Sequence, residues 1–253
     1  WLSLKRIARG CAEHQLNRAV PLLFTLRALS LAATAMILVL PPVLARDRGC
    51  RPEGIRPFLA YFVALGAGYI LIQVGLVQKF ILLLGSPTSA LSVIVFSMLV
   101  ASGLGSCFSA RLAGPGAERL GRVLAGIAGM IGALALLSGP LCSIAVAWPA
   151  PAKVALTVMA VAPPAFLMGV PFPTGLAQLE RRHRAAVRWA WALNAAASVL
   201  GSVAAVALGL CLGLRETLLV GGLLYVAAWA ATQGWRGRES VTELIASSAA
   251  RAG

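Results

Sequence analysis

Charged residues are scarce in this sequence and absent from most of its length. Its 253 residues include 22 Lys and Arg but only 8 Asp and Glu. These charges are separated by seven charge-free stretches of 18 to 31 residues: 28–45, 57–78, 80–110, 123–152, 154–179, 189–214 and 217–235. A soluble domain would carry charge every few residues, because its helices and strands need a face in water. The missing charge therefore argues against a soluble fold.

The charge-free stretches have the length of membrane spans. A helix needs about 20 apolar residues to cross a hydrocarbon core of about 30 Å, and 59% of the residues are hydrophobic. The sequence predicts an all-α, polytopic transmembrane helix bundle over 20–235, between a polar basic tail at 1–19 and a polar tail at 236–253. About seven spans are expected: 20–44, 57–84, 88–110, 120–147, 153–178, 189–213 and 216–235.

Basic residues gather in alternate connections between the expected spans. Fourteen fall in the first, third and fifth connections and the C-terminal tail, against three, Lys79, Lys153 and Arg215, on the other side. The positive-inside rule makes the richer side cytoplasmic, and a bacterial cytoplasmic membrane is the expected location. The four basic residues of the N-terminal tail then lie on the opposite side. Either the first span does not cross fully or a preceding segment is missing.

Signatures of soluble catalysis and of metal binding are also missing. The five cysteines form no C-x-x-C pair and no Cys/His ligand set, so no disulfide framework or metal site is expected. No glycine-rich loop stands between a strand and a helix, as nucleotide binding requires. We predict no catalytic residues, no cofactor and no enzyme activity for this chain alone. The net charge of +14 lies between spans, so the expected partner is the lipid bilayer and not nucleic acid.

Few polar side chains fall inside the expected spans. Gln73, Gln78, Asn194 and Ser198 are the candidates for an intramembrane polar site. Such side chains can join helices by hydrogen bonds or coordinate a substrate, and both interpretations are open. No Asp, Glu, His, Lys or Arg lies deep in a span. Because Gln and Asn do not titrate, proton-driven transport is disfavoured.

Proline and glycine concentrate in the expected span 153–178. An interior proline removes a helix hydrogen bond and clashes with the preceding turn, so a broken helix is predicted here. Non-helical backbone at membrane depth is found where it is buried in protein or lines a cavity. The break is either a structural kink or, as in transporters, part of a binding site. The segment comprises Pro163, Pro164, Gly169, Pro171, Pro173 and Gly175.

Small residues recur at every fourth position in the expected span 189–213. Such a stripe allows a neighbouring helix backbone to approach closely, so we predict a helix-packing face. Its members are Ala197, Gly201, Ala205, Gly209 and Gly213. Elsewhere Ser86 and Pro87 are expected to cap a new helix after a tight turn, as serine at the N-cap and proline at the first helical position commonly do.

Five segments are distinctive in their order and spacing. They are 66–80 (GAGYILIQVGLVQKF), 84–91 (LGSPTSAL), 102–106 (SGLGS), 167–176 (LMGVPFPTGL) and 189–202 (WAWALNAAASVLGS). Together they resemble the membrane region of bacterial multi-pass spermidine synthase-like proteins. The resemblance covers about 57–230, and its two later motifs are the more specific. At the positions of Gln73 and Ser86, that family usually shows Glu and His.

The resemblance implies a bundle that works beside a soluble domain. In such proteins hydrophobic helices are joined to a Rossmann-type aminopropyltransferase or methyltransferase-like domain. The implied role is to anchor, or cooperate with, a soluble synthase-like domain or chain that this sequence does not contain. Two alternatives are open from the residues: a transporter for a small, cationic metabolite such as a polyamine, and a structural subunit of a membrane complex.

Overall fold

The computed structural model of the protein describes residues 55–114 and 117–252, with side chains for 57–114 and 118–233. All of the described residues belong to one unit, within Arg48–Gly253. The expected N-terminal tail at 1–19, the expected span 20–44 and most of the first basic connection lie outside the described residues.

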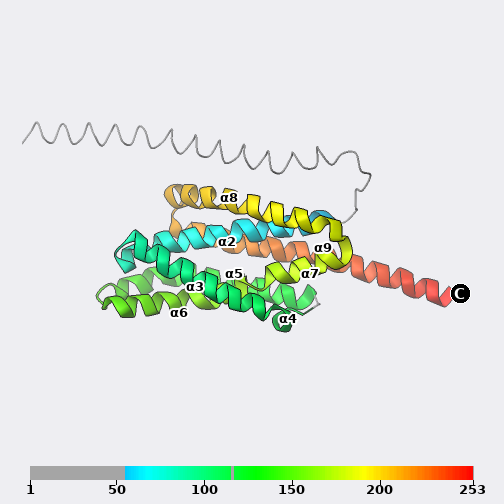
Figure 1. Ribbon diagram of the computed structural model, residues 1–253, viewed down its shortest axis with the longest axis horizontal. Coiled ribbons are helices and arrows are strands. Elements are labelled where there is room, and N and C mark those ends of the chain that lie inside the picture. Colours follow the sequence, from blue (N-terminus) through cyan, green and yellow to red (C-terminus); the bar gives the residue numbers. More distant parts are fainter. Residues whose placement is uncertain (1–54, 115–116, 253) are drawn as a thin grey trace, which may run out of the picture. The chain divides into compact units, whose positions relative to one another are not determined.

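The described residues form helices and turns, with no strand, which confirms the all-α expectation for this part of the chain. The elements are drawn in Figure 1. In chain order they are α2 (Ile55–Leu84), α3 (Pro87–Cys107), α4 (Ser109–Leu112), α5 (Ala117–Ala145), α6 (Ala150–Met168), α7 (Pro171–His183), the 3-10 helix η1 (Arg184–Ala186), α8 (Val187–Cys211) and α9 (Leu214–Ala252).

Within 55–114 and 117–252, five stretches are long and apolar enough to cross a membrane by length and composition. They are Pro57–Leu84, Pro87–Cys107, Glu118–Ala145, Ala150–Cys211 and Leu214–Gln233. The fourth holds 62 residues, about 93 Å if it were one straight helix, or roughly three times the hydrocarbon core. It contains α6, α7, η1 and α8, and Figure 1 shows the chain reversing direction between α6 and α8. The total of seven spans stays a prediction.

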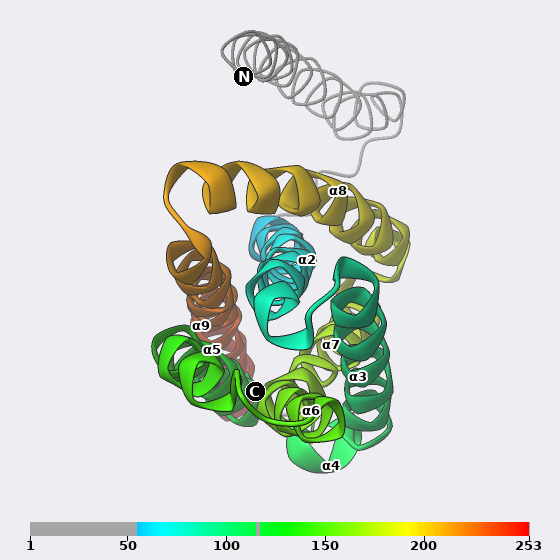
Figure 2. The same ribbon diagram turned by 90° about the vertical axis from the view of Figure 1, so that its left-hand side faces the viewer.

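Helix α2 is the centre of the unit that contains it. It contacts α3, α5, α6, α7, α8 and α9, and Figure 2 shows these helices arranged around it. An apolar 18-residue segment of Pro57–Leu84 is 56% buried, against 44% or less for the corresponding segments of the other four stretches. Tyr61, Phe62, Ile72 and Phe80 on α2 are almost fully buried. The core therefore runs along α2.

Large apolar side chains cover much of the outer surface. Leu82 is 85% exposed, Met159 74% and Phe96 71%. An apolar surface of this extent is a liability in water, whereas hydrocarbon solvates it. Lipid is therefore the solvent that suits these faces.

The long helices α2, α3, α5, α6, α8 and α9 alternate in direction, so basic residues collect at one end of the bundle (Figure 1). This arrangement agrees with the alternation expected from the sequence. At that end, among the described residues, lie Arg111, Arg119, Arg122, Arg181, Arg182, Arg184 and Arg188, while Lys79, Lys153 and Arg215 lie toward the other.

The helix ends agree with the sequence-based expectation at the turn between α2 and α3, and they differ from it at the C-terminus, where α9 is longer than expected. Ser86 is the N-cap of α3, its side chain accepts a hydrogen bond from the Ser89 amide at 3.1 Å, and Pro87 opens the helix. Gly85 has a φ of +80°, which glycine adopts readily. These caps confirm the expected turn. The expected tail at 236–253 is a continuation of α9, which runs to Ala252.

Candidate functional site

The candidate polar residues of α8 lie against α2. The Ser198 hydroxyl donates to the Gly66 carbonyl at 3.1 Å and lies 2.9 Å from the Asn194 carbonyl of its own helix. A Cβ placed on Gly66 would lie only 2.9 Å from Asn194 Oδ1. Asn194 and Ser198 are thus brought together at a helix crossing in which glycine permits backbone-to-backbone approach.

The two glutamines of α2 lie apart from this crossing. Gln78 reaches α8 nearer its C-terminal end, where a Cβ on Gly209 would come within 2.8 Å of Gln78 Oε1. Gln73 is half-buried and lies two turns along α2 from Gly66. The four candidates therefore spread along one helix pair, with only Asn194 and Ser198 meeting directly.

The small-residue stripe of α8 packs on α2 over most of its length. Ala197, Gly201 and Ala205 are buried, and a Cβ on Gly201 would lie 2.8 Å from the Ala67 carbonyl oxygen. Gly209 continues the stripe toward Gln78. Gly213 differs, because it lies beyond the end of α8 in the turn to α9, with a φ of +110°. Its small size serves the turn and not the packing face.

A second close crossing joins α3 to α6. The sequence reading assigned no role to it. The Gly105 α-carbon faces the Phe166 carbonyl, and the Gly169 α-carbon faces the Ser102 carbonyl, so closely that neither glycine has room for a Cβ. Phe166 and Gly169 lie three residues apart, as do Ser102 and Gly105, which is the spacing of neighbours on one helix face. This spacing is the sequence feature from which the α3–α6 crossing could have been predicted.

The break in the expected span 153–178 lies between α6 and α7. Helix α6 ends at Met168, and α7 begins at Pro171. Pro163 and Pro164 differ from the expectation, since both lie inside α6. Membrane helices tolerate interior proline where neighbouring helices compensate, and Pro164 is buried against such neighbours. Pro173 and Gly175 lie in the first turns of α7, where a proline costs few hydrogen bonds.

Side chains satisfy the backbone at this break. The buried Tyr61 hydroxyl donates to the Pro171 carbonyl at 2.7 Å. The Thr174 hydroxyl donates to the Val170 carbonyl at 2.9 Å. The Tyr61 ring fills the space where a side chain on Gly175 would lie. Irregular backbone is therefore held in protein, as burial away from water requires.

An aromatic cluster fixes α7 against α2 and α8. Phe172 meets Phe62 edge to face with ring centroids 5.5 Å apart, and it meets Trp191 at 4.8 Å. Both distances fall in the range that aromatic pairs prefer. The start of α7 is thus anchored on two other helices.

Gln178 of α7 carries an unusual polar group. Its side chain is only 9% exposed, and its Nε2 has no hydrogen-bond partner. A buried amide without a partner costs free energy, so such a group in a folded protein calls for a reason. The sequence analysis did not single it out, although Gln178 is the last residue of the expected span 153–178, next to the charged run 180–184.

The described part of the chain contains no set of side chains that could bind a metal ion. No group of three or more His, Cys, Asp or Glu side chains gathers there. Cys107, Cys142 and Cys211 are free thiols. An ion pair between Arg184 and Glu180, at 3.9 Å, is exposed to solvent and contributes little.

No protein-family model, curated protein or solved structure matches the chain. The length and composition of its helices make it a multi-pass membrane protein.

Proposed function

We propose that the protein is the membrane domain of a spermidine synthase-like system, which anchors or works with a soluble synthase-like domain or chain. The observation that supports this proposal is that the segments that carry the family resemblance contact one another. Segment 66–80 meets segment 189–202 at the Gly66–Ser198 contact. Segment 102–106 meets segment 167–176 where Gly169 lies against the Ser102 carbonyl.

These motifs therefore supply helix-to-helix contacts. Their glycines allow close approach, and their hydroxyl groups bond to backbone carbonyls across or along helices. Tyr69 in the first segment also lies within 3.4 Å of the Ser102 hydroxyl in the third. Residues that make such contacts build a rigid scaffold, and this role suits an anchor better than a reaction centre.

Co-flotation tests the anchoring role. A soluble aminopropyltransferase-like protein encoded beside this chain is expressed alone or with it, and membranes are floated on a density gradient. We expect the soluble protein in the membrane fraction only when this chain is present. Equal flotation without the chain, or none with it, would contradict the proposal.

The break beside α7 favours a second candidate, a transporter for a small cationic metabolite. A broken helix with a buried, unpartnered amide at Gln178 is the kind of polar position that transporters place near their substrates. Proteoliposomes with the purified chain are assayed for labelled spermidine uptake, with Gln178→Met and Asn194→Ala as variants. Ser92→Ala is the control, because Ser92 is exposed on α3. Saturable uptake that Gln178→Met abolishes supports this candidate. Uptake equal to that of empty liposomes excludes it for spermidine.

A further inference from the structure

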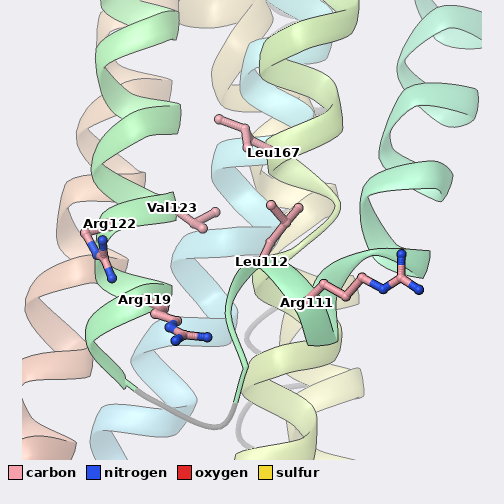
Figure 3. A pocket seen from close by; sticks show the side chains of 6 residues that line it. All are labelled: Arg111, Leu112, Arg119, Arg122, Val123 and Leu167. Carbon is pink, nitrogen blue, oxygen red and sulfur yellow. The ribbon is translucent and has the colours of Figure 1, made fainter.

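A pocket opens at the basic end of the bundle, between α4, α5 and the C-terminal end of α6. Its volume is about 540 Å³, which is within the range of small-molecule sites. Figure 3 shows the six residues that line it. They are Arg111, Leu112, Arg119, Arg122, Val123 and Leu167.

One half of the lining is apolar. Leu112, Val123 and Leu167 come from three different helices and face the same space (Figure 3). Leu167 also borders α5 deeper in the bundle, where a Cβ on Gly126 would lie 3.6 Å from Leu167 Cδ1. The apolar wall therefore extends from the pocket along the seam between α5 and α6, in the direction of the hydrocarbon core.

The other half of the lining is cationic. Arg119 and Arg122 are exposed on the first turns of α5, and Figure 3 places their side chains on the same side of the pocket. Arg111 projects on the other side, with its guanidinium carbon 5.7 Å from the centroid of the Phe108 ring. Three positive charges stand against the nearby Glu118, so the rim keeps an excess of positive charge. Guanidinium groups suit phosphate because their planar N–H donors match its oxygens.

The boundary between charge and hydrocarbon passes through this pocket. Arg122 is the last charge before the charge-free stretch 123–152, which begins with Val123. A ligand with a negative head and an apolar chain would match both halves at once. Free phosphate would use the rim alone and leave the apolar wall without a role.

We propose that this pocket is a binding site for an anionic phospholipid. The phosphate lies between the guanidinium groups of Arg119 and Arg122, and an acyl chain follows Leu112, Val123 and Leu167 into the seam between α5 and α6. Basic pockets between membrane helices on the cytoplasmic side are suited to anionic head groups. This inference is independent of the anchoring role.

Lipid titration of the full chain tests the proposal. The protein is placed in phosphatidylcholine nanodiscs with increasing phosphatidylglycerol, and bound lipid is counted by native mass spectrometry after release into detergent. We expect the number of bound phosphatidylglycerol molecules to level off at one per protein. The double variant Arg119→Gln/Arg122→Gln should bind this lipid roughly 30-fold more weakly. Each basic residue near the surface contributes about 1 kcal/mol of attraction, which is about fivefold in affinity.

Matched variants separate a site from general surface charge. Arg181→Gln/Arg188→Gln removes two exposed arginines at the same end but outside the pocket, and its affinity should change less than threefold. Leu112→Gln keeps the charge and should weaken lipid binding while leaving any response to inorganic phosphate unchanged. Equal losses in the two double variants would overturn the proposal, as would equal retention of phosphatidylcholine. Inorganic phosphate could instead prevent lipid retention equally in the wild type and in Leu112→Gln. That result would identify free phosphate as the ligand.

Discussion

Replacing Gly201 with alanine tests whether the α2–α8 crossing holds the bundle together. The new Cβ would lie 2.8 Å from the Ala67 carbonyl oxygen and 3.0 Å from the Ala67 α-carbon, both backbone atoms. Ordinary contact begins near 3.4 Å, so α8 must move away by about 0.6 Å in a well-packed interface. Overpacking of this kind typically costs about 1–3 kcal/mol.

The hydrogen bond across the same crossing adds to this cost. Ser198 donates to the Gly66 carbonyl at 3.1 Å, and a shift of this size lengthens the bond beyond good geometry. Hydrogen bonds between membrane helices contribute about 0.6 kcal/mol on average. The higher helix propensity of alanine offsets up to about 1 kcal/mol. We therefore expect Gly201→Ala to lower the free energy of unfolding by about 1–3 kcal/mol.

Unfolding by sodium dodecyl sulfate, followed by circular dichroism in mixed micelles, measures this difference. Gly129→Ala is the matched control, because a Cβ at Gly129 meets no atom within 4 Å. The control should be neutral or slightly stabilising. If Gly201→Ala proves as stable as Gly129→Ala, α8 does not approach α2 as closely as described and the packing argument fails.

Three further measurements test other features. Tyr61→Phe removes the hydrogen bond to the Pro171 carbonyl and should cost about 1 kcal/mol in the same unfolding assay; no loss would mean that the break is satisfied by other groups. Ser86→Ala removes the N-cap of α3 and should cost about 0.5–2 kcal/mol, with retained stability counting against the cap. Variants that keep Cys107 or Cys211 as the single cysteine, both exposed thiols near opposite ends of the bundle, should react with an impermeant maleimide from opposite sides of sealed vesicles. Labelling of both from one side would refute the alternating topology.

Helix existence and several helix boundaries could be predicted from the sequence because they depend on local chemistry. The absence of charge over 57–78 and 80–110 indicates apolar helices on both sides of a turn. Gly85, Ser86 and Pro87 then mark where one helix ends and the next begins, since a positive φ, a side-chain cap and a fixed proline φ each act within a few residues.

The position of the helix break could not be predicted from proline content. Pro163 and Pro164 remain inside α6, whereas the helix ends at Met168, just before the closely packed Gly169. The hydrogen bonds at the break are in part tertiary: Tyr61 of α2 donates to the Pro171 carbonyl, and Thr174 adds a local bond to the Val170 carbonyl. The cost of a broken helix depends on such partners, and they come from distant or later residues.

Helix pairing was also beyond the sequence pattern. The stripe of α8 indicates a packing face, but any helix with a small or apolar face is a suitable neighbour for it. The sequence does not specify that Gly201 meets Ala67 or that Gly105 meets Phe166. For the same reason, the unpartnered amide of Gln178 became visible only when its surroundings were known.

The central position of α2 constrains the order in which the protein can be assembled. Its contact with α8 joins residues 132 positions apart, so at about 5–20 residues per second the ribosome needs roughly 7–26 s to deliver the second partner. During that interval the glycine face and the two glutamines of α2 have neither α8 nor α9 beside them. We therefore expect a chain truncated before α8 to be degraded faster than the full chain, because the faces of α2 that α8 and α9 cover stay exposed.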